Sequence, residues 1–61
     1  MNAVIIRALR EFETEISTIC FDYFCMGALT TIEYHNKKDR AMRRCKIKIE
    51  DELEEWKGEE Q

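Results

Sequence analysis

Three cysteines and a single histidine are the residues best suited to metal or nucleophilic chemistry in this chain: Cys20, Cys25, Cys45 and His35. Zinc sites usually draw their ligands in pairs at short spacing, as in Cys-x-x-Cys. Cys20 and Cys25 stand five residues apart, which on a helix turns their side chains away from each other. We therefore expect three reduced cysteines, with no metal and no cofactor bound.

Asp22, Glu33 and His35 form the best candidate for acid–base chemistry, because a bend between them would bring the three side chains near one another. Catalysis also needs a concave site, and the sequence carries no glycine-rich phosphate loop, paired-carboxylate motif or cofactor fingerprint. Charged residues beside a bend are usually solvated. We expect no catalytic residues and a protein that is not an enzyme.

Charge is segregated in the second half of the chain, although the net charge is only −3. Residues 37–48 carry seven basic side chains against one acid, and residues 50–61 carry seven acids against one lysine. On a helix, the spacing of Lys37, Arg40, Arg44 and Lys48 makes a basic ridge. Such a ridge is a candidate contact for nucleic-acid phosphates, which supply most non-specific affinity.

The basic ridge has a second interpretation as one side of a set of ion pairs. In an antiparallel hairpin, residues 11–15 lie opposite residues 43–48, and the first of these segments contains three glutamates. Exposed pairs of this kind contribute little stability, but they help to set orientation and the choice of partner. The neighbouring acidic segment would also repel a phosphate backbone, so this interpretation is favoured over nucleic-acid binding.

Leu53 and Trp56 are the apolar residues of the acidic end. A tryptophan in such a segment is a candidate anchor for a protein partner, since tryptophans are frequent hot spots. Alternatively, the two side chains cap the hairpin against residues 4–6, and the sequence favours this capping role.

The elements that must position these groups follow from hydrophobic spacing. Seven apolar side chains recur at steps of four and three, as one face of a helix requires: Ile5, Leu9, Phe12, Ile16, Ile19, Tyr23 and Met26. The sequence predicts a helix over 3–26 with Asn2 as N-cap, a turn over 27–30 with Gly27 in a left-handed conformation, and a second helix over 31–57. Thr30 and Glu33 fit a capping box, and residues 58–61 should fray.

The second helix has a less regular apolar pattern. Its expected seam is Ile32, His35, Asp39, Met42, Lys46 (or neighbouring Cys45), Ile49, Leu53 and Trp56. A β-hairpin within residues 29–49 is the alternative, because part of this segment alternates apolar and charged residues. The absence of proline and the strong helix formers on either side favour a single all-α domain, an antiparallel helical hairpin over residues 1–61.

The end of the first helix is apolar almost all round, which predicts association. A chain of 61 residues builds only a marginal core alone. We expect a homodimer that forms a four-helix bundle, with an interface formed by Cys20, Phe21, Tyr23, Phe24 and Met26. The alternatives are a larger oligomer, or packing of the two phenylalanines under the Gly27 loop or against Tyr34 within one hairpin.

These expectations converge on a small non-enzymatic protein–protein interaction module or regulator that acts as a helical homo-oligomer on an unidentified protein partner. Small helical proteins of this build often serve as regulators, including in phage, although that is an argument from architecture alone. The alternative function is a dimeric nucleic-acid-binding protein using residues 37–48. We expect a cytoplasmic protein without a membrane contact, because the first residues do not resemble a secretory signal and no apolar run reaches the length of a membrane span.

Overall fold

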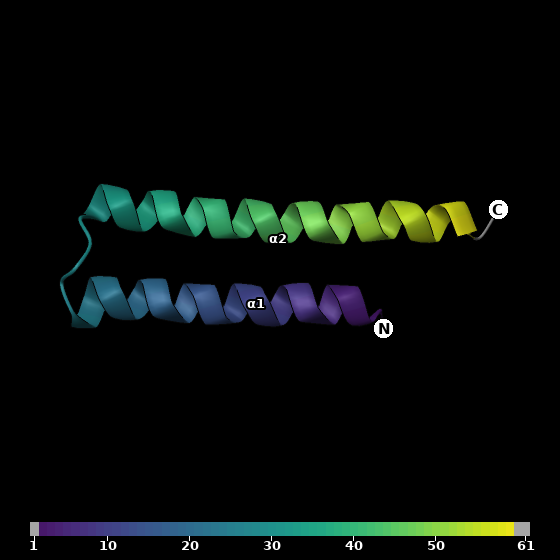
Figure 1. Cartoon of the computed structure of the whole chain (residues 1–61). Coiled ribbons are helices and arrows are strands. Elements are labelled where there is room, and N and C mark those ends of the chain that lie inside the picture. The colour runs from purple at the N-terminus through teal and green to yellow at the C-terminus, as the bar shows by residue number, and fades with distance from the viewer. Residues whose placement is uncertain (1, 60–61) are drawn as a thin grey trace.

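The computed structural model describes the backbone of residues 2–59 and the side chains of residues 2–56. Within these residues the chain is helical, in the order α1 (Ala3–Cys20), η1 (Phe21–Cys25) and α2 (Thr31–Glu59). The two long helices lie side by side and antiparallel (Figure 1). The prediction of an all-α chain with two packed helices is confirmed. The β-hairpin alternative is wrong, because α2 is continuous from Thr31 onward.

Side-chain caps fix where each long helix begins. The Asn2 Oδ1 atom accepts a hydrogen bond of 2.7 Å from the backbone N–H of Val4. At the start of α2, the Glu33 N–H donates to the Thr30 hydroxyl and the Thr30 N–H donates to the Glu33 carboxylate, each at 3.1 Å. Both predicted caps are confirmed, and each satisfies backbone donors that the first turn of a helix leaves without a partner.

The bend differs from the expected one in how the first helix ends. Gly27 has φ of 61°, the left-handed conformation predicted for it. However, α1 ends at Cys20 and the chain continues as η1, a π-helical turn in which the Met26 N–H donates to the Phe21 carbonyl at 3.1 Å. A π-helical turn advances more slowly around the axis than an α-helix. It therefore rotates the side chains of 21–25 away from the positions that an α-helix would give them.

The far end of α2 also departs from the prediction. The helix continues through Gly58 to Glu59, beyond the expected end at 57. The frayed tail expected over 58–61 reaches into residues 60–61, which lie outside the described residues.

Ala8 and Ala41 mark the line along which the helices approach most closely. Their side chains are 3% and 2% exposed, and they are the only buried apolar residues in the part of the chain that the structure describes. The Cys45 thiol lies 3.7 Å from the Ala8 carbonyl, which places it beside the same line. Small side chains at these points let the two backbones come close together.

The seam expected for α2 is therefore wrong in its rotation. Residues expected to be in contact with α1 are exposed, with Ile32 at 73%, Met42 at 51% and Trp56 at 56%. The contact line instead follows Tyr34 and Ala41, together with Cys45, the residue already expected as the alternative to Lys46. In α1 the apolar stripe is present, but Leu9 remains 44% exposed because the stripe is centred to one side of Ala8.

The hairpin is a single layer of helix. Its Cα atoms extend over 50 × 18 × 8 Å, and its accessible surface is 5133 Å². A compact monomer of 7.3 kDa would expose roughly 4,200 Å². Globular domains usually bury a core between two layers, and in the described residues no large side chain is fully buried. In the same part of the chain, neither α1 nor α2 contains an apolar stretch that could cross a lipid bilayer.

Candidate functional site

The contact line divides the hairpin into two faces with different chemistry. A helix turns by about 100° per residue, so side chains one or eight residues after Ala8 or Ala41 lie on one side of the line. Side chains three or seven residues after them lie on the other side. We call the first side the apolar face: Ile5, Leu9, Phe12 and Ile16 of α1, with Met42, Cys45, Ile49, Leu53 and Trp56 of α2.

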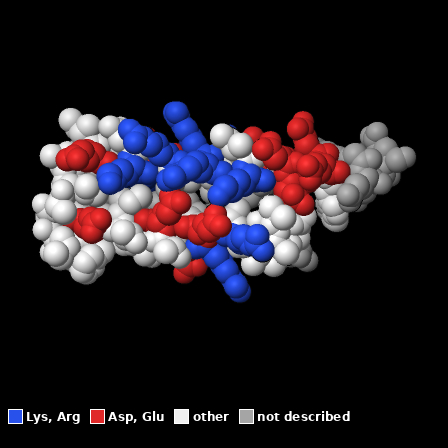
Figure 2. Space-filling view, viewed as in Figure 1, with Lys and Arg blue, Asp and Glu red and all other residues white. Residues whose placement is uncertain are grey.

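The opposite side is the charged face. It comprises Glu11, Thr14, Glu15 and Thr18 of α1, with Lys37, Arg40, Arg44 and Lys48 of α2. Figure 2 shows basic side chains along the middle of α2 and acidic side chains toward its C-terminal end. The basic ridge expected from the sequence therefore shares a face with the glutamates of α1.

Two ion pairs link the helices across the charged face. An Arg44 guanidinium nitrogen lies 2.5 Å from the Glu15 carboxylate, and the Lys48 ammonium lies 2.8 Å from the Glu11 carboxylate. The hydrogen bond from Lys48, together with its charge, lowers the pKa of Glu11 below its ordinary value. The expected pairing of 11–15 with 43–48 is confirmed, so half of the basic ridge is paired within the hairpin.

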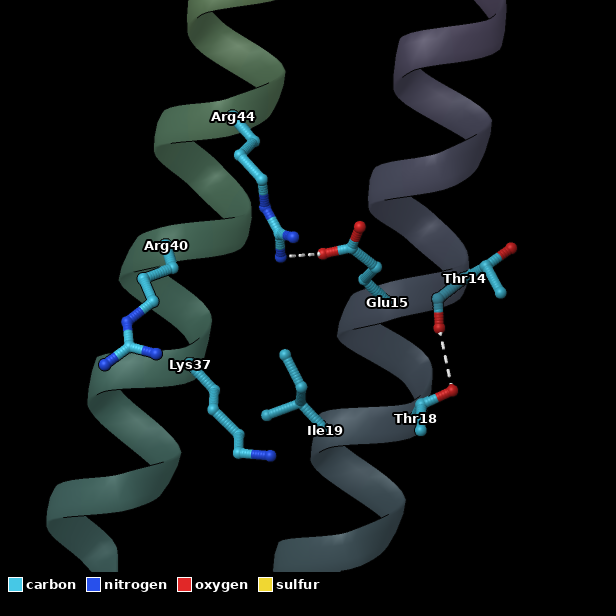
Figure 3. Close-up of a pocket in the computed structure, with 7 residues that line it drawn as sticks. All are labelled: Thr14, Glu15, Thr18, Ile19, Lys37, Arg40 and Arg44. Atoms are coloured by element: carbon cyan, nitrogen blue, oxygen red, sulfur yellow. Dashed lines mark hydrogen bonds and ion pairs between the residues drawn. The ribbon is translucent and has the colours of Figure 1, made fainter.

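The remaining two residues of the basic ridge border an open groove on the charged face. The groove has a volume of about 440 Å³, and Lys37 and Arg40 line it from α2 while Thr14 and Thr18 line it from α1. Figure 3 shows the Lys37 side chain extending toward Ile19, whereas the Arg40 side chain points away from α1. Both threonine hydroxyls donate to carbonyls one turn earlier in α1, at 3.1 Å. Arg44 and Glu15 also line the groove but pair with each other, so the groove offers Lys37 and Arg40 as its further basic groups and little other recognition chemistry.

The apolar face has no counterpart to these interhelical pairs. Leu9, Met42 and Leu53 are 44%, 51% and 42% exposed. Phe12, Ile16 and Ile49, on the same face, are half-buried. Together they form a nearly continuous apolar strip along the long axis of the hairpin. Monomeric proteins rarely expose such a strip, and where one occurs it marks an interaction surface. The sequence predicted an exposed apolar surface at the end of the first helix, but it did not predict the apolar strip along α2.

An aromatic cluster joins η1 to the start of α2. The rings of Tyr23 and Tyr34 stack with centroids 4.4 Å apart, and the Phe24 ring packs edge-on against both. The Tyr23 hydroxyl also hydrogen-bonds to the Thr31 hydroxyl at 2.8 Å. The cluster therefore ties η1 to the first turn of α2.

The residues expected at an oligomer interface divide into two groups. Tyr23 and Cys20 contact Tyr34, the latter with its sulfur 4.0 Å from the tyrosine hydroxyl, and are half-buried. Phe21, Phe24 and Met26 are 54%, 70% and 64% exposed. The contact of Phe24 with Tyr34 matches the alternative of packing within one hairpin, but this contact leaves most of the ring in solvent.

Leu53 and Trp56 lie beside the first turn of α1. With Ile5 and Asn2 they line a hollow of about 410 Å³, and the Asn2 amide donates a hydrogen bond to the Glu52 carboxylate there. Contact with the first turn agrees with the capping role. Trp56 is nevertheless 56% exposed, so much of its ring remains accessible to a partner.

The cysteines and the histidine are not brought together. Cys25 is exposed, Cys20 and Cys45 contact different parts of the seam, and His35 lies against the Tyr34 ring. No group of three or more metal-ligating side chains gathers among residues 2–56.

Glu33, from the candidate acid–base cluster, is committed to its cap. The hydrogen bond from the Thr30 backbone lowers the pKa of this carboxyl.

Comparison with known proteins adds no assignment to this geometry. No protein-family model, curated protein or solved structure matches the chain.

Proposed function

We propose that the chain is a non-enzymatic protein–protein interaction module or regulator that works as a helical homo-oligomer. The favoured form is a homodimer in which two hairpins stack their apolar faces into a four-helix bundle. The single observation that carries this proposal is a one-layer hairpin whose only buried apolar side chains, among the described residues, are Ala8 and Ala41.

The energetic argument rests on how little the hairpin buries on its own. A single hairpin leaves Leu9, Met42, Leu53 and Trp56 each at least two-fifths exposed. Burying a large apolar side chain contributes about 1.5–3 kcal/mol. Covering several of them in each subunit is comparable with the whole stability of a small domain. Folding and association are therefore coupled in this proposal, and the dimer supplies the missing second layer.

Sedimentation equilibrium over a wide range of protein concentration tests this proposal, with circular dichroism to follow helix content in parallel. The expected result is a dimer that dissociates on dilution and loses helix as it does so. A well-folded monomer at every concentration would overturn the proposal. A stable trimer or tetramer would be consistent with a helical homo-oligomer but would contradict the proposed dimer.

A second candidate function is nucleic-acid binding through the basic ridge, favoured by the placement of Lys37 and Arg40 on an open groove. Arg44 and Lys48 are engaged with glutamates, which weakens this candidate. Titration of duplex DNA and RNA at increasing salt provides the test. Binding that weakens steeply with salt and is lost in a Lys37→Ala, Arg40→Ala variant would support it. Absence of binding at low salt would remove it.

A further inference from the structure

The charges of α2 are ordered along its length, and this order constrains how two copies can be arranged. The basic residues Lys37, Lys38 and Arg40 lie near the bend, and the acidic segment 50–55 lies near the opposite end. Two hairpins stacked face to face by a two-fold axis have two possible arrangements. Either both bends lie at the same end of the bundle, or they lie at opposite ends.

Bends at the same end would place like charges together. Both acidic segments would lie at the end of the bundle away from the bends. Both basic segments would lie nearer the bends, level with each other. The two-fold axis of that arrangement runs parallel to the helices, so the two α2 helices occupy diagonal corners, about 11–14 Å apart when neighbouring helices are about 8–10 Å apart. This separation exceeds the Debye length of about 8 Å at physiological salt, so the repulsion between like segments is largely screened.

Bends at opposite ends instead stack each α2 on α2 of the second copy. Lys38, on the edge that borders the apolar face, then lies level with Glu52 of the second copy, which lies beside the contact line. Charge complementarity of this kind selects orientation and register more than it adds affinity. It acts here on a surface that is already apolar, so orientation and affinity come from different residues.

The exposed aromatic residues favour the same arrangement. The exposed Trp56 ring lies at the end away from the bend, and the exposed Phe24 ring, with Tyr34, lies at the bend. Opposite bends bring the tryptophan of each copy to the aromatic cluster of the other.

We infer that the apolar face binds a second copy of this chain with the two bends at opposite ends of the bundle. Glu52 of each copy then lies level with Lys38 of the other, whereas Lys37 and Arg40 face away from the second copy on the charged face. This inference rests on the proposed function, because it assumes that a dimer forms through the apolar face. Matching Trp56 to Tyr34 of the second copy places the two-fold axis midway between them, at the level of Cys45, which itself lies against Ala8.

Distances between spin labels distinguish the two arrangements, and the chain offers an exposed native position at Cys25. A Cys20→Ala, Cys45→Ala variant leaves Cys25 as the sole label site. With opposite bends, Cys25 lies about 25 Å along the axis from the two-fold at 1.5 Å per residue, so the two labels are about 50 Å apart. With bends at the same end, only the width of the bundle separates them, about 30 Å or less including the label arms.

A second label site makes the test independent of side-chain reach. Adding Thr18→Cys in a background that also carries Cys25→Ala moves the label closer to the proposed axis. Opposite bends predict a distance about 20 Å shorter than at Cys25, whereas bends at the same end predict nearly equal distances. Circular dichroism and sedimentation on the same labelled samples establish that each variant is helical and dimeric.

The outcomes separate this inference from the proposed function. A long Cys25 distance that shortens at position 18 supports opposite bends. A dimer with short and nearly equal distances would overturn the inference and leave the proposed function intact. A labelled protein that is folded and monomeric would overturn both, and a larger assembly would overturn the two-fold arrangement.

Discussion

The charged face and the apolar face lie on either side of one contact line, yet they differ in how far a single chain completes them. On the charged face, Glu15 pairs with Arg44 and Glu11 with Lys48, so opposite charges meet within the hairpin. On the apolar face, Leu9 and Met42 remain about half exposed with no cover from the hairpin. The charged face pairs opposite charges within the hairpin, whereas the apolar face leaves its large side chains exposed.

This difference separates the residues that align α1 with α2 from the residues whose burial would stabilise the protein. The paired side chains on the charged face are exposed, with Arg44 at 61% and Lys48 at 53%, and exposed ion pairs contribute about 0–1 kcal/mol. They align α1 with α2 without making the hairpin stable. In the proposed dimer, the stabilising free energy comes from burial on the apolar face, where a single hairpin leaves Leu9 and Met42 about half exposed.

Disruption of the apolar face should give the largest effect. We expect a Leu9→Glu, Met42→Glu variant to weaken the dimer by at least about 100-fold, because each glutamate places a charge where apolar surface is to be buried. Sedimentation and circular dichroism measure the loss. A Thr14→Glu, Thr18→Glu variant adds the same charge to exposed positions of the charged face and should remain dimeric. Equal effects of the two variants would remove the distinction between the faces.

Enlarging a residue on the contact line should have an intermediate effect. We expect Ala41→Leu to destabilise the protein by about 1–3 kcal/mol, because the 2% exposed alanine leaves no room for a larger side chain without separating the helices. Chemical denaturation at a fixed protein concentration measures this, since stability depends on concentration in a dimer. Ala3→Leu, at an exposed position of α1, is the matched control. Unchanged stability in Ala41→Leu would mean that the helices do not meet at this line.

The sequence predicted the local features of the fold well, for physical reasons. Asn2, Gly27, Thr30 and Glu33 act through short-range hydrogen bonds or backbone conformation, so their roles depend only on near neighbours. The helical hairpin followed from these signals together with the apolar spacing of α1. The π-helical turn of η1 carries no comparable signal, because no proline or glycine interrupts residues 21–25.

The rotation of α2 could not be predicted because the contact line uses small residues. A search for large apolar side chains selects Met42, Leu53 and Trp56, whereas closest approach occurs at Ala41, where a small side chain lets the backbones meet. The apolar spacing identified the stripe of α1 but not its displacement to one side of Ala8. The apolar residues of α1 and those of α2 both lie to the same side of the contact line, and together they form the candidate association surface.

Protonation of the charged face should give the smallest effect, and its sign follows from the lowered pKa of Glu11. A carboxylate whose pKa is lower in the folded state stabilises the fold above its ordinary pKa of about 4.3, and this contribution is lost as the pH falls through the folded value. Glu11 is exposed to solvent, which screens its pairing with Lys48, so we expect only a slight decrease in melting temperature in that range, smaller than the effect of Ala41→Leu. Carboxyl NMR titration should show the Glu11 pKa returning toward its ordinary value in Lys48→Met, because the hydrogen bond from the ammonium is its main cause. An unchanged Glu11 pKa in that variant would contradict the pairing, and a large loss of stability would show that the charged face contributes more free energy than exposed ion pairs allow.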